Sequence, residues 1–224
     1  FEQGSGLLPH QVAREELPDN PRIGILSGPS FAQELAQQLP CAVTLASDNT
    51  AWIEPLAAAL SSAVLRLYAN DDMVGVGVGG AVKNVMAIAV GIADGLQYGL
   101  NARAALMTRG LAEMSRLVAA CGGNAMTCMG LAGMGDLEVT CMSPHSRNRT
   151  FGYELAQGVT LDAYRARTHM VVEGALACRT LHDLALAHDV DLPLARTVRA
   201  IVWEGYDVVA AAQDLLDRPQ KPEF

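Results

Sequence analysis

The chain has 224 residues, of which 50% are hydrophobic and 18% are charged, so it can form a sizeable core and is not disordered as a whole. Its 16 basic and 24 acidic residues give a formal net charge of −8, which argues against non-specific binding of nucleic acid. The five cysteines have no CxxC spacing; they fit neither a disulfide framework nor a zinc site, and they indicate a reducing compartment.

The first seventy residues predict alternating strands and helices. Strands are expected at 22–27, 41–47 and 64–68, and helices at 30–38, with Ser30 as N-cap, and at 52–62. This order is typical of a parallel sheet with helical crossovers.

Beyond residue 70 only helices are predicted. They are expected at 81–92, 102–120, 154–157, 173–188, 195–203 and 208–215, followed by a loose tail at 217–224. The change of periodicity near Asn70 therefore predicts a domain boundary there. The N-terminus lacks the pattern of a signal peptide. The apolar stretch 73–93 is interrupted by Lys83 and rich in glycine, so no membrane span is expected.

Lysine is rare, because the chain contains fourteen arginines but only Lys83 and Lys221. Lys83 lies among apolar residues, where it is either a side chain that snorkels from a buried helix or a reactive amine. Because desolvation lowers the pKa of an ammonium group, such a lysine can exchange a proton near neutral pH. Arginine cannot do this, since its guanidinium stays protonated.

A second cluster, the segment 145–149, places a hydroxyl, an amide and two guanidinium groups within a few positions. This donor set suits a phosphate, and the alternative is a solvated charged turn. The glycine-rich segment 130–136 follows a poor strand, so it is not a pyrophosphate-binding loop. It is expected to be a turn that brings Asp136 to a substrate hydroxyl or to the lysine, or else a purely structural turn. The histidine spacing predicts no metal site.

Taken together, these segments resemble the bacterial-type NAD(P)-dependent glycerol-3-phosphate dehydrogenases. The matching blocks are SGPSFAQE (27–34), GGAVKN (79–84), DG (94–95), NARAAL (101–106), TRGLAE (108–113), GLAGMGD (130–136), SRNR (146–149) and VEG (172–174). The resemblance implies that residues 1–70 are the C-terminal part of a dinucleotide-binding domain, an α/β remnant of a Rossmann-type parallel sheet. Residues 71–224 would form an all-α substrate-binding and catalytic domain.

The resemblance also assigns roles to single residues. Lys83 matches the catalytic lysine of the family. The substrate-binding positions that it implies are Gly28, Ser30, Lys83, Asp136, Ser146, Arg147 and Asn148. The cofactor-binding positions that it implies, for NAD or NADP, are Ala32, Arg147, Val171 and Glu173.

Three departures from the family pattern stand out. The chain shows no GxGxxG unit and begins at Phe1, just after a lysine that holds substrate in the family, so we expect an N-terminally truncated chain that binds cofactor poorly. Gly77 stands where the family usually has Glu. Gln97 and Leu100 replace residues that are commonly Gly and Asp.

The function implied by the resemblance is the interconversion of dihydroxyacetone phosphate and sn-glycerol 3-phosphate by hydride transfer. In the family this reaction feeds glycerophospholipid synthesis in the cytoplasm. Two alternatives stay open: a different phospho-substrate dehydrogenase of similar architecture, and an inactive fragment that binds phosphate or dimerises. A homodimer and the choice between NAD and NADP also stay open.

Overall fold

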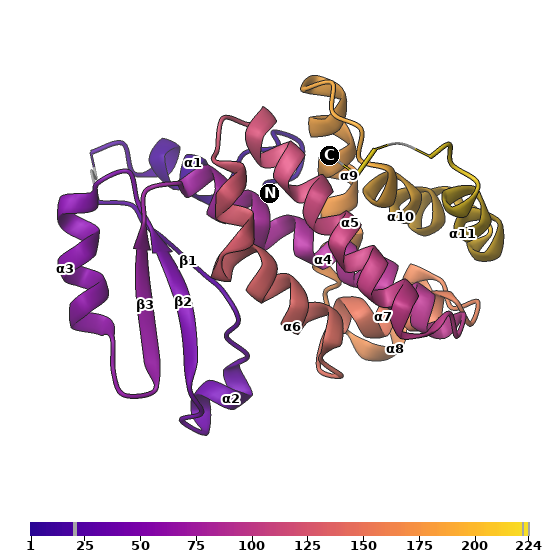
Figure 1. Ribbon diagram of the computed structural model, residues 1–224, viewed down its shortest axis with the longest axis horizontal. Helices are drawn as coiled ribbons and strands as arrows, with labels where there is room; N and C mark the ends of the chain where they lie inside the picture. The colour runs from indigo at the N-terminus through magenta and orange to yellow at the C-terminus, as the bar shows by residue number, and fades with distance from the viewer. Residues whose placement is uncertain (20–21, 221, 224) are drawn as a thin grey trace.

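Three strands form one sheet at one end of the molecule, in the order β1–β2–β3 (Figure 1). The computed structural model describes residues 1–19, 22–220 and 222–223. The strands are β1 (Ile25–Ser27), β2 (Cys41–Ala46) and β3 (Leu65–Asn70). The central strand β2 carries the buried side chains of the sheet, including Val43 and Leu45.

The pairing of the strands is mixed. β2 and β3 are parallel, with Cys41 opposite Leu65, and the helix α3 (Thr50–Leu60) connects them, as predicted. β1 is antiparallel to β2, with Ile25 opposite Ala46, so the prediction of a wholly parallel sheet is wrong for this strand. The helix between them, α2 (Ala32–Ala36), has only five residues. It is too short to return the chain along the sheet, and a parallel connection needs such a return.

The start of α2 also differs from the prediction. Its N-cap is Phe31, which makes no capping bond through its side chain. The hydroxyl of Ser30 instead donates a hydrogen bond to the carbonyl of Gly28 at 3.0 Å. Ser30 therefore closes the turn after β1 and does not cap the helix.

Helices make up the rest of the described chain and confirm the predicted helical character beyond residue 70. They are α1 (Pro9–Glu16), α4 (Met73–Gly95), α5 (Gly99–Ala120), α6 (Asp136–Met142), α7 (Arg147–Leu155), α8 (Leu161–Thr168), α9 (Glu173–Ala187), α10 (Pro193–Glu204) and α11 (Val208–Leu216). A 3₁₀-helix (Ala125–Met129) and a short π-helix (Leu131–Gly135) precede α6. The sequence did not predict α1, α6 or α8.

The long helix α4 is the centre of the helical region, and α5, α6, α7 and α9 pack around it (Figure 1). It begins earlier than predicted because Asp72 caps it, accepting a hydrogen bond from the N–H of Gly75 at 2.8 Å. α4 is long and apolar enough to cross a membrane, with a mean hydropathy of 1.7, but 72% of that window is buried inside the protein. This burial is typical of the core helix of a globular domain.

Candidate active site

Lys83 and Asp136 form a largely buried ion pair. Lys83 lies in the middle of α4, and Asp136 is the first residue of α6, directly after the short π-helix. The Lys83 Nζ and the Asp136 Oδ2 are 2.5 Å apart, and the two side chains are 19% and 6% exposed. Of the two partners expected for Asp136, the structure thus provides the lysine.

Thr140, Gly28 and burial also act on the pKa of the Asp136 carboxyl group. Thr140, one turn along α6, donates its hydroxyl to Oδ1 at 3.4 Å, and the backbone N–H of Gly28 lies near enough to the same carboxylate to lower its pKa. Burial raises the pKa of Asp136, and the ion pair with Lys83 and these hydrogen bonds oppose that rise. Sequence reasoning missed Thr140, although its position four residues after Asp136 puts both on one helix face.

The backbone conformation of the turn after β1 requires glycine at position 28. Its φ of +144° and the 3.0 Å that would separate an added Cβ from the Cα of Val43 leave no room for a side chain. The turn after β1 can therefore pass close to β2 and turn its N–H toward Asp136.

The expected phosphate-binding segment forms the N-terminus of α7. Ser146 is the N-cap, and its buried hydroxyl oxygen accepts the N–H of Arg149 at 3.2 Å. The side chain of Arg147 is 47% exposed, and it pairs with Glu173 of α9 at 2.5 Å. This arrangement leaves free N–H groups of a helix start beside an exposed guanidinium, which suits an anion.

The second guanidinium of this segment does not take part. Arg149 turns toward α4 and binds the carboxylate of Asp94 through Nε at 2.8 Å and through a terminal nitrogen at 2.7 Å. The prediction of two arginines available to one phosphate is therefore wrong, because only Arg147 is directed outward.

Asn148 connects three helices inside the protein. Its side-chain amide donates to the Oδ1 of Asn84 on α4 at 3.0 Å and accepts the N–H of Gly174 on α9 at 2.9 Å. Asn84 follows Lys83 directly, and Asn148 follows Arg147. The lysine site and the phosphate-binding segment are thus tied together by a hydrogen bond between their neighbours.

A hollow of about 380 Å³ opens between β1, α4 and α9. Asn84, Glu173 and Ser27 supply polar groups to it, and Val76 and Leu176 supply apolar ones. Ala32 and Val171, which the resemblance placed along the cofactor, are exposed and do not line this hollow.

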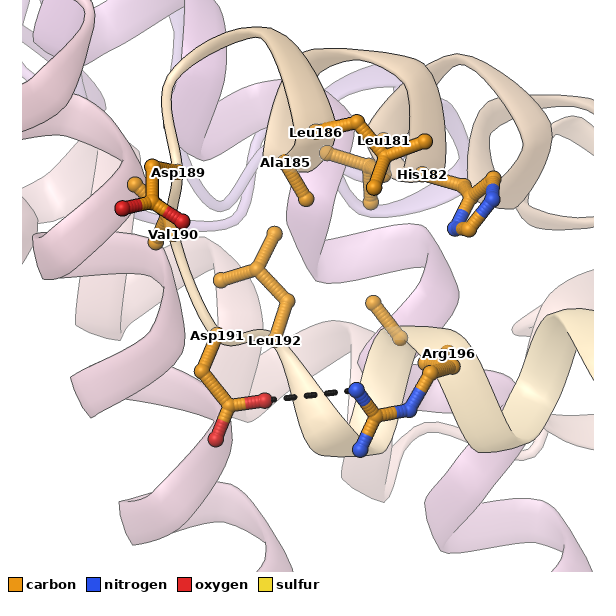
Figure 2. Close-up of a pocket in the computed structure, with 10 residues that line it drawn as sticks. Leu181, His182, Ala185, Leu186, Asp189, Val190, Asp191, Leu192 and Arg196 are labelled. Atoms are coloured by element: carbon orange, nitrogen blue, oxygen red, sulfur yellow. Dashed lines mark hydrogen bonds and ion pairs between the residues drawn. The ribbon is translucent and has the colours of Figure 1, made fainter.

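A second hollow of about 310 Å³ lies between the end of α9 and the start of α10, and it contains none of the expected site residues. Figure 2 shows the apolar side chains of Ala185 and Leu192 directed toward one another and the contact between Asp191 and Arg196. The two atoms of this contact are 3.5 Å apart. Among the described residues, no three His, Cys, Asp or Glu side chains are grouped so that they could hold a metal ion.

Comparisons with known proteins agree with the fold. The chain matches the sequence models of the N-terminus of NAD-dependent glycerol-3-phosphate dehydrogenase over residues 1–53 and of its C-terminus over residues 72–213. These matches identify the chain as part of an NAD-dependent dehydrogenase with a helical C-terminal region. More specifically, the chain belongs to the NAD-dependent glycerol-3-phosphate dehydrogenase family.

Individual relatives support the same family. All of this chain aligns with glycerol-3-phosphate dehydrogenase [NAD(P)+] of Neisseria meningitidis serogroup C at 51% identity and with that of Paucimonas lemoignei at 49% identity, covering 68% and 67% of those proteins. The crystal structure of glycerol-3-phosphate dehydrogenase from Coxiella burnetii superposes with a TM-score of 0.90 at 44% identity, over 96% of this chain and 66% of that one. The chain thus spans about two thirds of the length of these relatives.

Proposed function

We propose that this protein interconverts dihydroxyacetone phosphate and sn-glycerol 3-phosphate, using NAD or NADP. The observation that carries the proposal is the hydrogen bond between Asn84 and Asn148. It joins a buried lysine–carboxylate pair to an anion-binding helix start, so one small molecule can bind to both. A three-carbon phosphoester with an oxygen function at C2 meets this requirement.

Lys83 is the proposed proton donor and acceptor. In the reducing direction its ammonium donates a proton to the oxygen at C2, which avoids a free alkoxide. Asp136 holds the ammonium in place and balances its charge. In the oxidising direction the neutral amine takes the same proton from the hydroxyl. The nicotinamide, when bound, supplies or accepts the hydride at C2.

The phosphate is proposed to bind at the start of α7. Arg147 leaves Glu173 to contact the phosphate, while Ser146 donates its hydroxyl hydrogen, which its role as N-cap does not use. Asn148 keeps Asn84 directed toward the substrate. Holding the phosphate in this way aligns C2 with Lys83 and lowers the entropic part of the barrier. Gly28 and Ser30 complete the substrate side through the turn after β1.

The hollow beside Asn84 has a mostly apolar lining from β1, α4 and α9. Gly77 and Gly80 leave its wall on α4 without side chains, and an added Cβ at Gly80 would lie 3.1 Å from the Ser27 hydroxyl oxygen. Glu173 at its edge is suited to accept hydrogen bonds from a ribose. We therefore propose this hollow for the nicotinamide end of the cofactor, and we propose that Arg147, Ala32 and Val171 contact the cofactor outside the hollow.

Four further features belong to the proposal. The domain boundary falls near Asn70, where β3 ends and α4 is about to begin. The five free cysteines suit the cytoplasm. The product is a building block of glycerophospholipids, which places the reaction in lipid synthesis. Exposed apolar side chains on the helical region suit a homodimer; among them are Leu186, Val209 and Leu216. Analytical sedimentation would measure the oligomeric state.

The test is an assay of NADH or NADPH oxidation with dihydroxyacetone phosphate, together with calorimetric titration of glycerol 3-phosphate. We expect binding of glycerol 3-phosphate and, in a chain that carries the whole dinucleotide-binding domain, turnover with dihydroxyacetone phosphate in preference to 6-phosphogluconate or ketopantoate. A protein that binds no glycerol 3-phosphate and turns over none of the phosphorylated ketone would overturn the proposal. A preference for 6-phosphogluconate would assign the site to a related dehydrogenase.

A further inference from the structure

Asp94 lies on α4 about three turns after Lys83 and is held by two arginines. Its Oδ1 accepts two hydrogen bonds from Arg103 of α5, at 3.1 and 2.7 Å. Its Oδ2 accepts Nε of Arg149 at 2.8 Å and a terminal nitrogen of the same side chain at 2.7 Å. The Asp94 side chain is only 9% exposed, so solvent screens these charge-assisted contacts weakly.

The helices α4 and α7 touch at their backbones near this group. A Cβ added at Gly91 would lie 2.0 Å from the carbonyl oxygen of Arg149, and one added at Gly152 would lie 2.1 Å from that of Ile88. Glycine at these positions allows the close approach, and directional contacts then fix the position of one helix along the other, one of them the hydrogen bond between Asn148 and Asn84. A forked guanidinium–carboxylate contact is directional, so it selects one position along the axis.

Arg149 connects Asp94 to the anion-binding segment at the start of α7. Its side chain is bound to Asp94, and its backbone N–H is bound to the hydroxyl oxygen of Ser146. Arg147 lies between these two residues in the sequence. The start of α7 therefore has a rigid attachment to the same helix that carries Lys83.

We propose that Asp94, acting through Arg149, is a positioning residue for the phosphate of the substrate. It sets the distance between the anion-binding start of α7 and the amine of Lys83. This role rests on the proposed function, and it adds to it a residue that does not touch the substrate. Arg103 supports Asp94 from the other side and contributes less, because it does not contact α7 through this pair.

The test compares the affinity for glycerol 3-phosphate among variants by calorimetric titration. Asp94→Asn and Arg149→Lys each disturb the forked contact. Arg149→Lys keeps both charges, so it provides a folded variant for the test if Asp94→Asn does not fold. We expect the Kd to rise on the order of tenfold in both, because small displacements of binding groups have large effects. Arg103→Gln should give a smaller rise.

Glu154→Gln is the matched control. It removes a carboxylate that pairs with Arg167 at the other end of the same helix α7, and we expect an unchanged Kd. A purely structural role for Asp94 would lower the melting temperature and the number of competent sites without changing the Kd of the folded protein. Positioning raises the Kd at an unchanged number of sites.

Two results would count against the inference, and they can be told apart. Wild-type affinity in both Asp94→Asn and Arg149→Lys, with normal wild-type binding, would overturn the positioning role alone. A wild-type protein that binds no glycerol 3-phosphate would overturn the proposed function and this role with it.

Discussion

Asn148 donates a hydrogen bond to Asn84 at 3.0 Å, and this contact joins the two halves of the site. Asn84 is the neighbour of Lys83 on α4, and Asn148 is the neighbour of Arg147 on α7. Asn148 is only 4% exposed, and Asn84 is half-buried at the wall of the hollow. The backbone positions that carry Lys83 and Arg147 are therefore connected before any substrate binds.

Replacing Arg147 tests the anion site directly. In Arg147→Ala we expect the KM for dihydroxyacetone phosphate to rise on the order of 30- to 100-fold, since a charge-assisted hydrogen bond to the phosphate is lost. Cofactor affinity should also weaken, because Arg147 is itself proposed to lie along the cofactor. Arg167→Ala removes another exposed arginine that pairs with a carboxylate of α7. This control should leave steady-state kinetics unchanged; equal effects in the two variants would refute the assignment.

Replacing Gly152 tests the close contact of α4 and α7. The added Cβ of Gly152→Ala would lie 2.1 Å from a backbone oxygen of α4, and we expect a loss of about 3 kcal/mol in the free energy of unfolding. Gly77→Ala on α4 is the control, since its nearest neighbour would be at 3.4 Å. It should stabilise the protein by up to about 1 kcal/mol. Urea denaturation measures both, and comparable stability of the two variants would contradict the packing described.

Glu113 should make stability depend on pH. It is 2% exposed on α5, and its carboxylate accepts the N–H groups of Leu194 and Ala195 at the start of α10, at 2.7 and 3.2 Å. Burial raises its pKa to about 7 from 4.5, against the opposing effect of these hydrogen bonds and of Arg116. Because the folded state holds the proton more tightly, the stabilisation is complete below pH 4.5 and is lost as the pH rises through about 7.

The size of this effect is about 3 kcal/mol at most. Urea denaturation of the wild type and of Glu113→Gln across this pH range measures it as the difference between the two proteins. The difference removes the contribution of Asp136, whose raised pKa acts in the same direction. Parallel stability curves for the two proteins would show that Glu113 does not titrate in this way.

The sequence predicted elements better than it predicted their partners. The strands 41–47 and 64–68 stand out because runs of β-forming residues end in Asp and Asn, and both are present. The antiparallel direction of β1 could not be seen, because a periodic pattern defines a strand but not its neighbour. The early start of α4 was missed because the glycines from Gly75 to Gly80 disfavour a helix in isolation, and tertiary contacts overrule that preference.

The same distinction applies to the site. Lys83 was a candidate from the scarcity of lysine and from its apolar neighbours, and its contact with Asp136 was one of three interpretations of that aspartate. The pairing of Arg149 with Asp94 was not predictable, because it joins distant parts of the chain and depends on how α7 packs on α4. The tail at 217–220 forms no helix or strand beyond α11, and Lys221 lies outside the described residues.

The turnover number of Lys83→Met, measured with saturating NADH and dihydroxyacetone phosphate, tests the proposed mechanism most directly. Lys83→Arg is its control, because it keeps a positive charge beside Asp136 but cannot release a proton. We expect turnover to fall by about 10²- to 10⁴-fold in both variants, with the affinity for NADH unchanged. Near-normal turnover in Lys83→Met would contradict the role of this amine in proton transfer.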